Sequence, residues 1–238
     1  MSNITPYFFG IYTIFLKNYS KKGNLMKNIF KEFKIKKELK KFKEFKKNFK
    51  FEFKEIEEKK KSLYFDGVCI RDGEDGEFLG ESETFVNVGY KFHGALPKAL
   101  SNLFPYEFYF KGFKLHSIES VFQGFKVKDK VAQRYLFSYH SLNSNNIKAA
   151  SDYNWKEKGI VYFQGKAIDR NSKDYEDFID KLYVSAIQNP LYRNVLKNVG
   201  DKYILHAIGV ESKKDTVFSR FEFEYQLNLL KAYVQANY

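Results

Sequence analysis

Phenylalanine recurs among lysine and glutamate between residues 27 and 61 (KNIFKEFKIKKELKKFKEFKKNFKFEFKEIEEKKK). The apolar positions follow one another mostly at steps of three and four residues, which places them on one stripe of a helix. Several Glu–Lys pairs four residues apart support the same structure. The pattern predicts a basic amphipathic helix. Its predicted stripe consists of Phe30, Phe33, Phe42, Phe45, Phe49, Phe53 and Ile56.

Short apolar pieces joined by glycine-containing turns follow between residues 62 and 115. The pieces SLYFDGVCI and ETFVNVGYKF are typical of strands. The run PYEFYFKGFKL (105–115) predicts a hairpin with Lys111 and Gly112 at its tip. A later strand-like run, YILHAIG, contains His206.

Helical periodicity dominates from Ser117 onward. Ser117 suits an N-cap, and the apolar residues behind it recur on one face. Asp215 and Thr216 are expected to cap the last helix. Further helices are predicted within residues 128–150 (ending in a polar loop), 173–188, 190–198 and 221–234. These elements predict an α+β fold: a mostly helical domain over residues 62–238 with a small antiparallel sheet, preceded by an extension over residues 1–61.

The net charge of +12 belongs almost wholly to that extension. Residues 1–61 hold 18 Lys and 7 Glu, hence +11, whereas residues 62–238 hold 23 Lys+Arg and 22 Asp+Glu, hence +1. The basic helix can pack on the domain as a solvated element, or it can contact nucleic acid or anionic lipid. Nucleic-acid contact through residues 27–61 is thus one of the open alternatives, which the charge of this segment supports.

The apolar residues 4–16 number 13, whereas a spanning helix needs about 20. Lysines follow this run instead of preceding it, unlike a signal peptide. We therefore expect a leader without stable membrane insertion, and Met26 is an alternative start. The single cysteine, Cys69, excludes a disulfide framework and is expected to be inert. These features favour a cytoplasmic protein.

The chain has no P-loop, GxGxxG, GxSxG or HExxH motif, and its four histidines lack metal-ligand spacing. We expect neither a metal site nor a cofactor. Glu119 and Gln123 are one helical turn apart, and Lys126 follows three residues later. Each candidate also has a structural interpretation: a solvated glutamate, a core histidine at His206, a helix cap at Asp215. The sequence pattern alone thus predicts an α+β domain and does not indicate its activity.

Two segments resemble the NADAR family (named for NAD and ADP-ribose), also described as YbiA-like. Its hallmark is a Leu-Ser-Asn-Phe-like segment followed by Ser-x-Glu-x-x-x-Gln-x-x-Lys. LSNLFPYEF (100–108) and HSIESVFQGFK (116–126) fit this order, and further segments extend the resemblance over about residues 84–234. Many members close with Asp-x-x-Trp-Gly-x-Gly, where this chain has DTVFSRFEF. That departure affects the substrate more than the fold.

The resemblance implies a metal-free N-glycosidase that hydrolyses a ribosyl C1′–N bond. Its substrate would be an ADP-ribosylated nucleobase or a phosphoribosyl pyrimidine intermediate of riboflavin biosynthesis. Such a bond breaks through an oxocarbenium-like state, which a carboxylate near C1′ stabilises. Glu119 is the expected carboxylate, while the amine of Lys98 or Lys126 could instead trap C1′ covalently.

Other candidates are expected to bind the substrate. Cationic groups would bind its phosphates, aromatic rings would stack on its base, and polar groups would hydrogen-bond to its ribose. They are Asn102, Ser101, Gln123, Phe122, Trp155, His206, Asp215 and Arg220. Two rival interpretations stay open. One is non-catalytic binding of ADP-ribose or NAD; the other is a scaffold whose basic arm contacts nucleic acid or a membrane.

Overall fold

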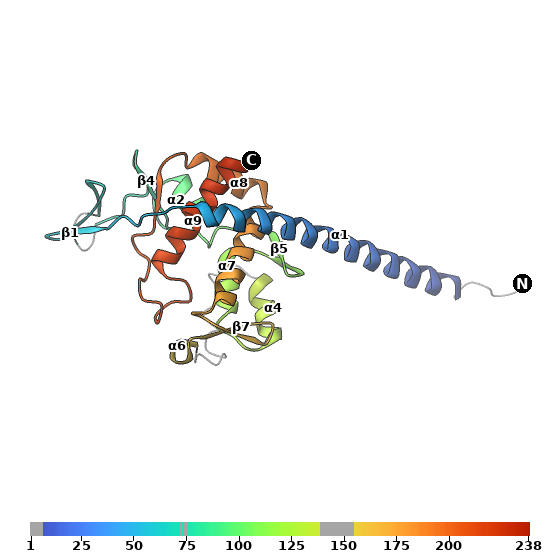
Figure 1. Ribbon diagram of the computed structural model, residues 1–238. Helices are drawn as coiled ribbons and strands as arrows, with labels where there is room; N and C mark the ends of the chain where they lie inside the picture. Colours follow the sequence, from blue (N-terminus) through green and yellow to red (C-terminus); the bar gives the residue numbers. More distant parts are fainter. Residues whose placement is uncertain (1–6, 72, 74–75, 139–154) are drawn as a thin grey trace, which may run out of the picture.

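The computed structural model describes residues 7–71, 73, 76–138 and 155–238, with residues 7–26 described by their backbone. The fold is α+β, as predicted, with helices packed around several small sheets (Figure 1). The helices are α1 (Tyr7–Asn48), α2 (Ala95–Ala99), α3 (Ile118–Gly124), α4 (Lys130–Ser138), α6 (Trp155–Lys158), α7 (Lys173–Ala186), α8 (Pro190–Asn198) and α9 (Arg220–Asn237). The strands are β1 (Glu57–Lys59), β2 (Ser62–Phe65), β3 (Val68–Arg71), β4 (Phe85–Asn87), β5 (Phe108–Phe110), β6 (Phe113–Leu115), β7 (Ile160–Phe163), β8 (Lys166–Asp169) and β9 (Tyr203–Leu205).

The strands pair in short ladders instead of forming one sheet. β1, β2 and β3 are antiparallel, as are the β5–β6 and β7–β8 hairpins. The predicted hairpin over residues 105–115 is confirmed, and Lys111 and Gly112 at its tip both have positive φ. The parallel pair of β4 with β9 was not predicted, because nothing local in either strand indicates a partner so distant in the sequence.

α1 ends earlier than the sequence predicts. Beyond Asn48 the chain is extended, and Phe49, Phe51 and Phe53 alternate with polar residues at a period of two. Phe51 stacks on Tyr203, with ring centroids 5.6 Å apart and planes at 17°. The helix prediction over residues 49–61 is therefore wrong, because aromatic side chains two residues apart can pack only from an extended segment.

The predicted apolar stripe of α1 is correct at Phe42, which is buried, and at Phe45, which packs against the main core. Ile35 and Leu39, which the prediction did not include, also turn toward the domain: Ile35 is buried and Leu39 packs against the core. Phe30 and Phe33, by contrast, are 63% and 67% exposed. The prediction is wrong for these two because the helix turns its side chains at residues 35, 39 and 42 toward the domain, and the helical spacing then points residues 30 and 33 away from it.

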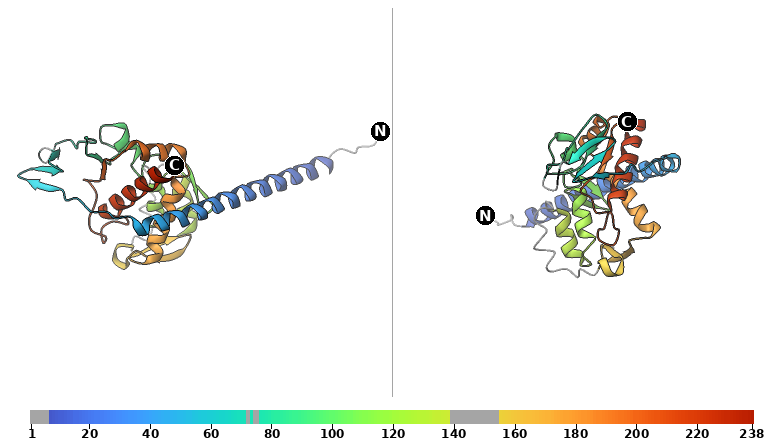
Figure 2. Two further views of the ribbon diagram at one scale, coloured as in Figure 1. Left: turned by 45° about the horizontal axis from the view of Figure 1, so that its top comes forward. Right: turned by 90° about the vertical axis from the view of Figure 1, so that its left-hand side faces the viewer.

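Ion pairs fasten α1 to α7. Lys46 binds Asp180 at 2.9 Å, Lys43 binds Asp177 at 2.8 Å, and Glu32 binds Lys181 at 3.0 Å. The N-terminal part of the helix extends past the domain (Figures 1 and 2). Among the described residues, no helix combines the length and the apolar content that crossing a membrane requires.

The helix boundaries near the core follow their local signals. The side chain of Ser117 accepts a hydrogen bond from the Ser120 amide and caps α3, as predicted. Asn189 and Pro190 separate α7 from α8, also as predicted. Ser219, and not Asp215 or Thr216, caps α9, where it forms a capping box with Glu222. The polar loop predicted after α4 lies outside the described residues.

The stripe predicted for the last helix is confirmed, since its apolar side chains are all buried. They belong to the main core, which α7 and α9 share with the end of α1. The members of the stripe are Phe223, Leu227, Leu230 and Val234.

Candidate functional site

A pocket of about 300 Å³ lies between α3, the turn after α2, the loop after β9 and the segment before α9. It collects residues that the sequence singled out from three separate segments. These residues are Ser101, Asn102, Glu119, Phe122, Lys126 and His206. The pocket is therefore the candidate site.

α3 supplies the acidic wall of the pocket. Glu119 lies in the first turn, and Gln123 stands one turn later on the same side. The Gln123 amide nitrogen donates to the Glu119 carboxylate, and its carbonyl oxygen accepts from the Lys126 ammonium at 3.1 Å. Gln123 is thus a bridge that fixes a carboxylate and an amine relative to each other.

The turn at Ser101 and Asn102 forms a facing wall. The backbone carbonyl of Asn102 accepts from the Glu119 amide at 2.9 Å, which ties the turn to α3. The Asn102 side-chain oxygen accepts from the Tyr183 hydroxyl at 2.9 Å. Burial raises the pKa of Tyr183 well above its ordinary value, so this hydroxyl stays protonated and keeps donating.

Aromatic rings close another side. Phe122 stacks on Phe218, with centroids 4.9 Å apart and planes at 18°. Phe223 meets Phe218 edge-on and lies 4.7 Å from the His206 ring. Phe218 and Phe223 also line the pocket. Neither was predicted from the sequence as a lining residue, because both fit an ordinary apolar stripe on or before a helix.

His206 is held as a neutral imidazole. Its Nδ1 lies 2.8 Å from the carbonyl oxygen of Val88, which can only accept, so Nδ1 carries the proton. Burial lowers the pKa of His206 below its ordinary value, although the hydrogen bond to Val88 opposes this. Nε2 is therefore left as a hydrogen-bond acceptor.

Buried polar side chains hold the loop that carries His206 in place. Buried Glu224 accepts from the His206 amide at 2.9 Å, and Asn87 accepts from the Ala207 amide at 3.0 Å. Burial also raises the pKa of Glu224, while its ion pair with Arg220 opposes this. Buried polar groups with defined partners give this loop a fixed position.

Five predicted site residues do not line the pocket. One is Gln123, which is linked to the pocket through its hydrogen bonds with Glu119 and Lys126. Lys98 is exposed in the last turn of α2, and Asp215 is exposed before α9. Trp155 is buried in the main core at the start of α6. Arg220 is buried between Glu224, at 2.8 Å, and Glu211, at 2.7 Å, so its Nε and Nη1 atoms are occupied by structural ion pairs. A short sequence pattern does not distinguish these placements from lining positions.

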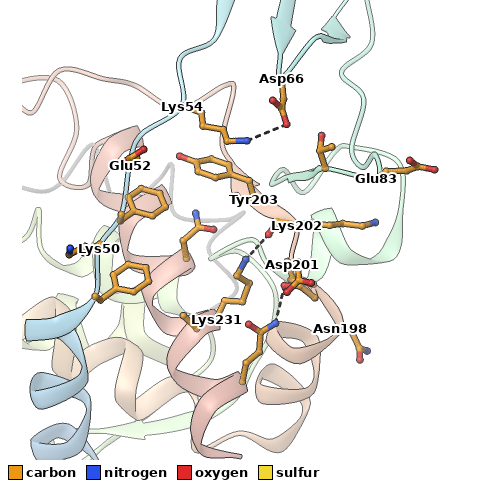
Figure 3. A pocket seen from close by; sticks show the side chains of 18 residues that line it. Lys50, Glu52, Lys54, Asp66, Glu83, Asn198, Asp201, Lys202, Tyr203 and Lys231 are labelled. Carbon is orange, nitrogen blue, oxygen red and sulfur yellow. Dashed lines mark hydrogen bonds and ion pairs between the residues drawn. The ribbon is translucent and has the colours of Figure 1, made fainter.

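A larger cavity of about 860 Å³ lies between residues 49–54, β9 and α9 (Figure 3). Three of its four lining lysines have acceptors, among them Lys202, which binds Glu81 at 2.6 Å. Lys54 binds Asp66 at 3.2 Å, and the Lys231 ammonium donates to the backbone carbonyl of Lys202 at 2.6 Å. Lysines and acidic residues both line this cavity, so its surface does not carry a single sign of charge. None of the predicted site residues is among the residues that line it. Within the described ranges, no three His, Cys, Asp or Glu residues cluster as a metal site would require.

A family model described as bacteriophage protein GP30.3 matches residues 95–232, more than half of the chain. The chain belongs to this family. A curated relative from Enterobacteria phage T4 is 30% identical over 136 residues, which are 56% of this chain and 88% of that protein. It is described as an uncharacterized 17.1 kDa protein in the Gp30–rIII intergenic region. No solved structure matches the chain.

Membership of the GP30.3 family corrects the resemblance to the NADAR family, which is wrong as an assignment. Several positions of the resembling segments have local structural roles: Ser117 caps α3, and Glu119 and Gln123 pair as neighbours one turn apart. Such roles recur in unrelated helices. The GP30.3 match includes the pocket residues from Ser101 to Phe223, while Val88 lies before it.

Proposed function

We propose that the pocket around Glu119 hydrolyses an N-ribosyl C1′–N bond. One observation carries this proposal: a carboxylate, an amine, an acceptor imidazole and a stacked aromatic wall line the same cavity of about 300 Å³. Pockets that combine a few convergent polar groups with apolar walls are typical small-molecule sites. These groups also match the chemistry of the reaction.

In this reaction, water adds to C1′ while the C1′–N bond breaks and its electron pair stays on the leaving nitrogen. Positive charge develops on the ribosyl ring, and the Glu119 carboxylate is suited to stabilise it. The same carboxylate can take one proton from the attacking water, and the leaving nitrogen must gain one. General acid–base help of this kind typically contributes about 10²–10⁴ in rate.

Lys126 is suited to supply the proton to the leaving nitrogen, since Gln123 holds its ammonium next to Glu119. The alternative is covalent: a neutral Lys126 amine attacks C1′ while the C1′–N bond to the base breaks, and the proton that the amine loses passes to the leaving nitrogen. Water then adds to C1′ as the bond between Lys126 and C1′ breaks, which releases the sugar and returns the free amine. His206 and Asn102 would bind ribose hydroxyls, with the Nε2 atom of His206 as an acceptor. The Phe122–Phe218 wall would stack on the base.

Two substrate classes fit the proposal: an ADP-ribosylated nucleobase and a phosphoribosyl pyrimidine intermediate of riboflavin biosynthesis. Nucleic-acid contact through residues 27–61 stays a prediction, because lysine charge alone supports it. A cytoplasmic location also stays a prediction.

The test compares the wild-type protein with Glu119→Gln on both substrates, using mass spectrometry to detect the released base and sugar. We expect turnover of one substrate and a loss of at least about 10² in rate in the variant. Glu107→Gln is the matched control, because the exposed Glu107 carboxylate pairs with Lys114 of β6 at 2.7 Å and does not line the pocket. Equal turnover by the wild-type protein and Glu119→Gln would contradict the proposal.

Non-catalytic binding of ADP-ribose or NAD is the second candidate function. The observation that favours it is the hydrogen bond from Gln123 to Glu119, which occupies part of the carboxylate that catalysis would need. Calorimetry with ADP-ribose separates the two candidates. Binding by the wild-type protein with no turnover of either substrate would favour this candidate.

A further inference from the structure

We infer that the face of α1 turned away from the domain docks on an anionic lipid surface. This outer face of α1 is defined by exposed residues spaced mostly three and four apart along the helix. Its members are Ile29, Phe30, Phe33, Lys36, Lys37, Lys40 and Lys41. This inference does not depend on the chemistry of the pocket.

The outer face exposes large apolar side chains next to one another. Ile29 is 53% exposed, Phe30 is 63% exposed and Phe33 is 67% exposed. Isolated exposed apolar residues are ordinary on protein surfaces, whereas adjacent ones indicate an interaction. α1 does not need these three side chains to bind the domain, because Leu39 and Phe42 already pack in the main core and Ile35 is buried.

The acidic residues of α1 do not neutralise this face. Glu32 binds Lys181 and Glu38 binds Tyr233, so both turn toward the domain. Glu44 pairs with Lys47 at 2.8 Å. Within the described part of the chain, Lys36, Lys37, Lys40 and Lys41 have no acidic partner. The outer face therefore combines unneutralised lysines with apolar side chains.

This combination is typical of a helix that lies in a membrane interface. Apolar side chains enter the boundary between headgroups and acyl chains, while lysines meet anionic headgroups. A second copy of the chain fits less well, because two such faces would bring lysines against lysines. Nucleic acid would engage the lysines but would gain nothing from the aliphatic side chain of Ile29. An anionic bilayer can bind the lysines through its headgroups and bury the exposed apolar side chains at the same time.

The geometry leaves this face accessible. The N-terminal part of α1 extends past the body of the domain in two different views (Figures 1 and 2). The domain lies on the opposite side of the helix, where Lys43 and Lys46 bind α7. The exposed apolar residues lie toward this extending end and the lysines follow them along the helix.

The test is co-sedimentation of the full chain with two kinds of vesicle: phosphatidylcholine alone, and phosphatidylcholine with about 30% phosphatidylserine. We expect binding to the anionic vesicles only. Phe30→Ser with Phe33→Ser should weaken it about tenfold or more, since the apolar contact is lost. Replacing the four lysines of the outer face by Gln should also weaken it about tenfold or more and remove its salt dependence.

Two matched controls separate this face from a general effect of charge or hydrophobicity. Val131→Ser with Leu191→Ser removes apolar side chains that are exposed on other helices. A quadruple Gln variant at Lys128, Lys156, Lys158 and Lys197 removes the same number of exposed lysines elsewhere. Neither should change vesicle binding, and circular dichroism should show that all variants are folded.

Three outcomes would overturn the inference. The first is vesicle binding that the two phenylalanine substitutions leave unchanged. The second is binding to a single-stranded or duplex oligonucleotide, lost in the lysine variant, without binding to anionic vesicles. The third is concentration-dependent self-association in sedimentation velocity that the phenylalanine substitutions abolish, again without vesicle binding.

Discussion

His206 donates its Nδ1 proton to the backbone carbonyl of Val88 at 2.8 Å, just past the ends of the parallel strands β4 and β9. Val88 lies before the residues that match the GP30.3 family, whereas His206 lies within them. A segment outside the family match therefore fixes the tautomer and orientation of a pocket side chain. The parallel strand pair is what brings these two distant positions together.

The first prediction concerns the pH dependence of stability. Burial lowers the pKa of folded His206 below its ordinary value of 6.5, so the unfolded chain takes up this proton at a higher pH than the folded protein does. Stability should therefore decline as the pH falls below about 6.5. His206→Gln should lose this part of the decline. Urea unfolding of both proteins between about pH 7.5 and about pH 5 measures it. A wild-type-minus-variant difference that does not change with pH would count against the prediction.

The second prediction concerns the contribution of α1 to the core. Phe42 is fully buried and meets the Tyr233 ring edge-on, with centroids 5.2 Å apart. Phe42→Ala should lower the free energy of unfolding by about 3–5 kcal/mol, because it leaves a cavity between α1 and α9. Phe33→Ala is the control and should change stability by less than about 0.5 kcal/mol, since Phe33 is exposed. Similar values for the two would show that α1 does not pack as described.

That contact also changes how the N-terminal extension can be tested. Deleting residues 1–61 would remove a charged arm and, with Phe42, a part of the main core. A loss of function in such a truncated chain could result from unfolding. Point substitutions on the outer face of α1 keep the core contact and are the sharper test.

The sequence predicted elements well where local signals act alone. Ser117 capped a helix, Pro190 opened one, and Lys111 and Gly112 turned a hairpin. It failed at residues 49–53, where phenylalanines fit both a three-to-four spacing and a spacing of two. The rings of Tyr203, Phe221 and Tyr225, all distant in the sequence, select the extended form.

In the candidate site, too, the positions set by local structure could be predicted, whereas those set by distant contacts could not. Glu119, Gln123 and Lys126 follow one another at steps of four and three residues, about two helical turns, so their proximity could be predicted from helical geometry. The position of His206 depends on a strand pair that no local pattern specifies. Arg220 looked available for a phosphate, but its two carboxylate partners can be recognised only once α9 and the loop before it are folded.

The third prediction concerns the ion pairs of Arg220 with Glu224 and Glu211. Arg220→Ala would leave Glu224 buried without its cation, and removing one partner of a buried pair typically costs about 3–5 kcal/mol. We expect a loss of that size in urea unfolding. Glu211→Ala removes the exposed partner of the same arginine and should cost less than about 1 kcal/mol. Equal costs for the two substitutions would contradict a structural role for the Arg220–Glu224 pair.

The fourth prediction concerns Gly209, which lines the pocket. A Cβ atom at this position would lie 2.6 Å from Cδ2 of His206 and 2.8 Å from Cβ of Arg220. Neither neighbour can move freely. The His206 ring is hydrogen-bonded to the Val88 carbonyl, and Arg220 begins α9 and is held by its ion pairs with Glu211 and Glu224. Gly209→Ala should therefore destabilise the protein by about 1–3 kcal/mol and displace the His206 ring.

The displacement can be measured directly by following the His206 imidazole in an NMR titration. If Gly209→Ala weakens the hydrogen bond to Val88 and lets water reach the ring, the pKa of His206 should move up toward its ordinary value, because burial is the main cause of its depression. Gly200→Ala is the matched control: its φ of 61° makes the substitution strained, yet a Cβ there meets nothing within 4 Å. That variant should lose stability without altering the titration of His206. An unchanged titration in Gly209→Ala would show that the loop yields and the ring does not.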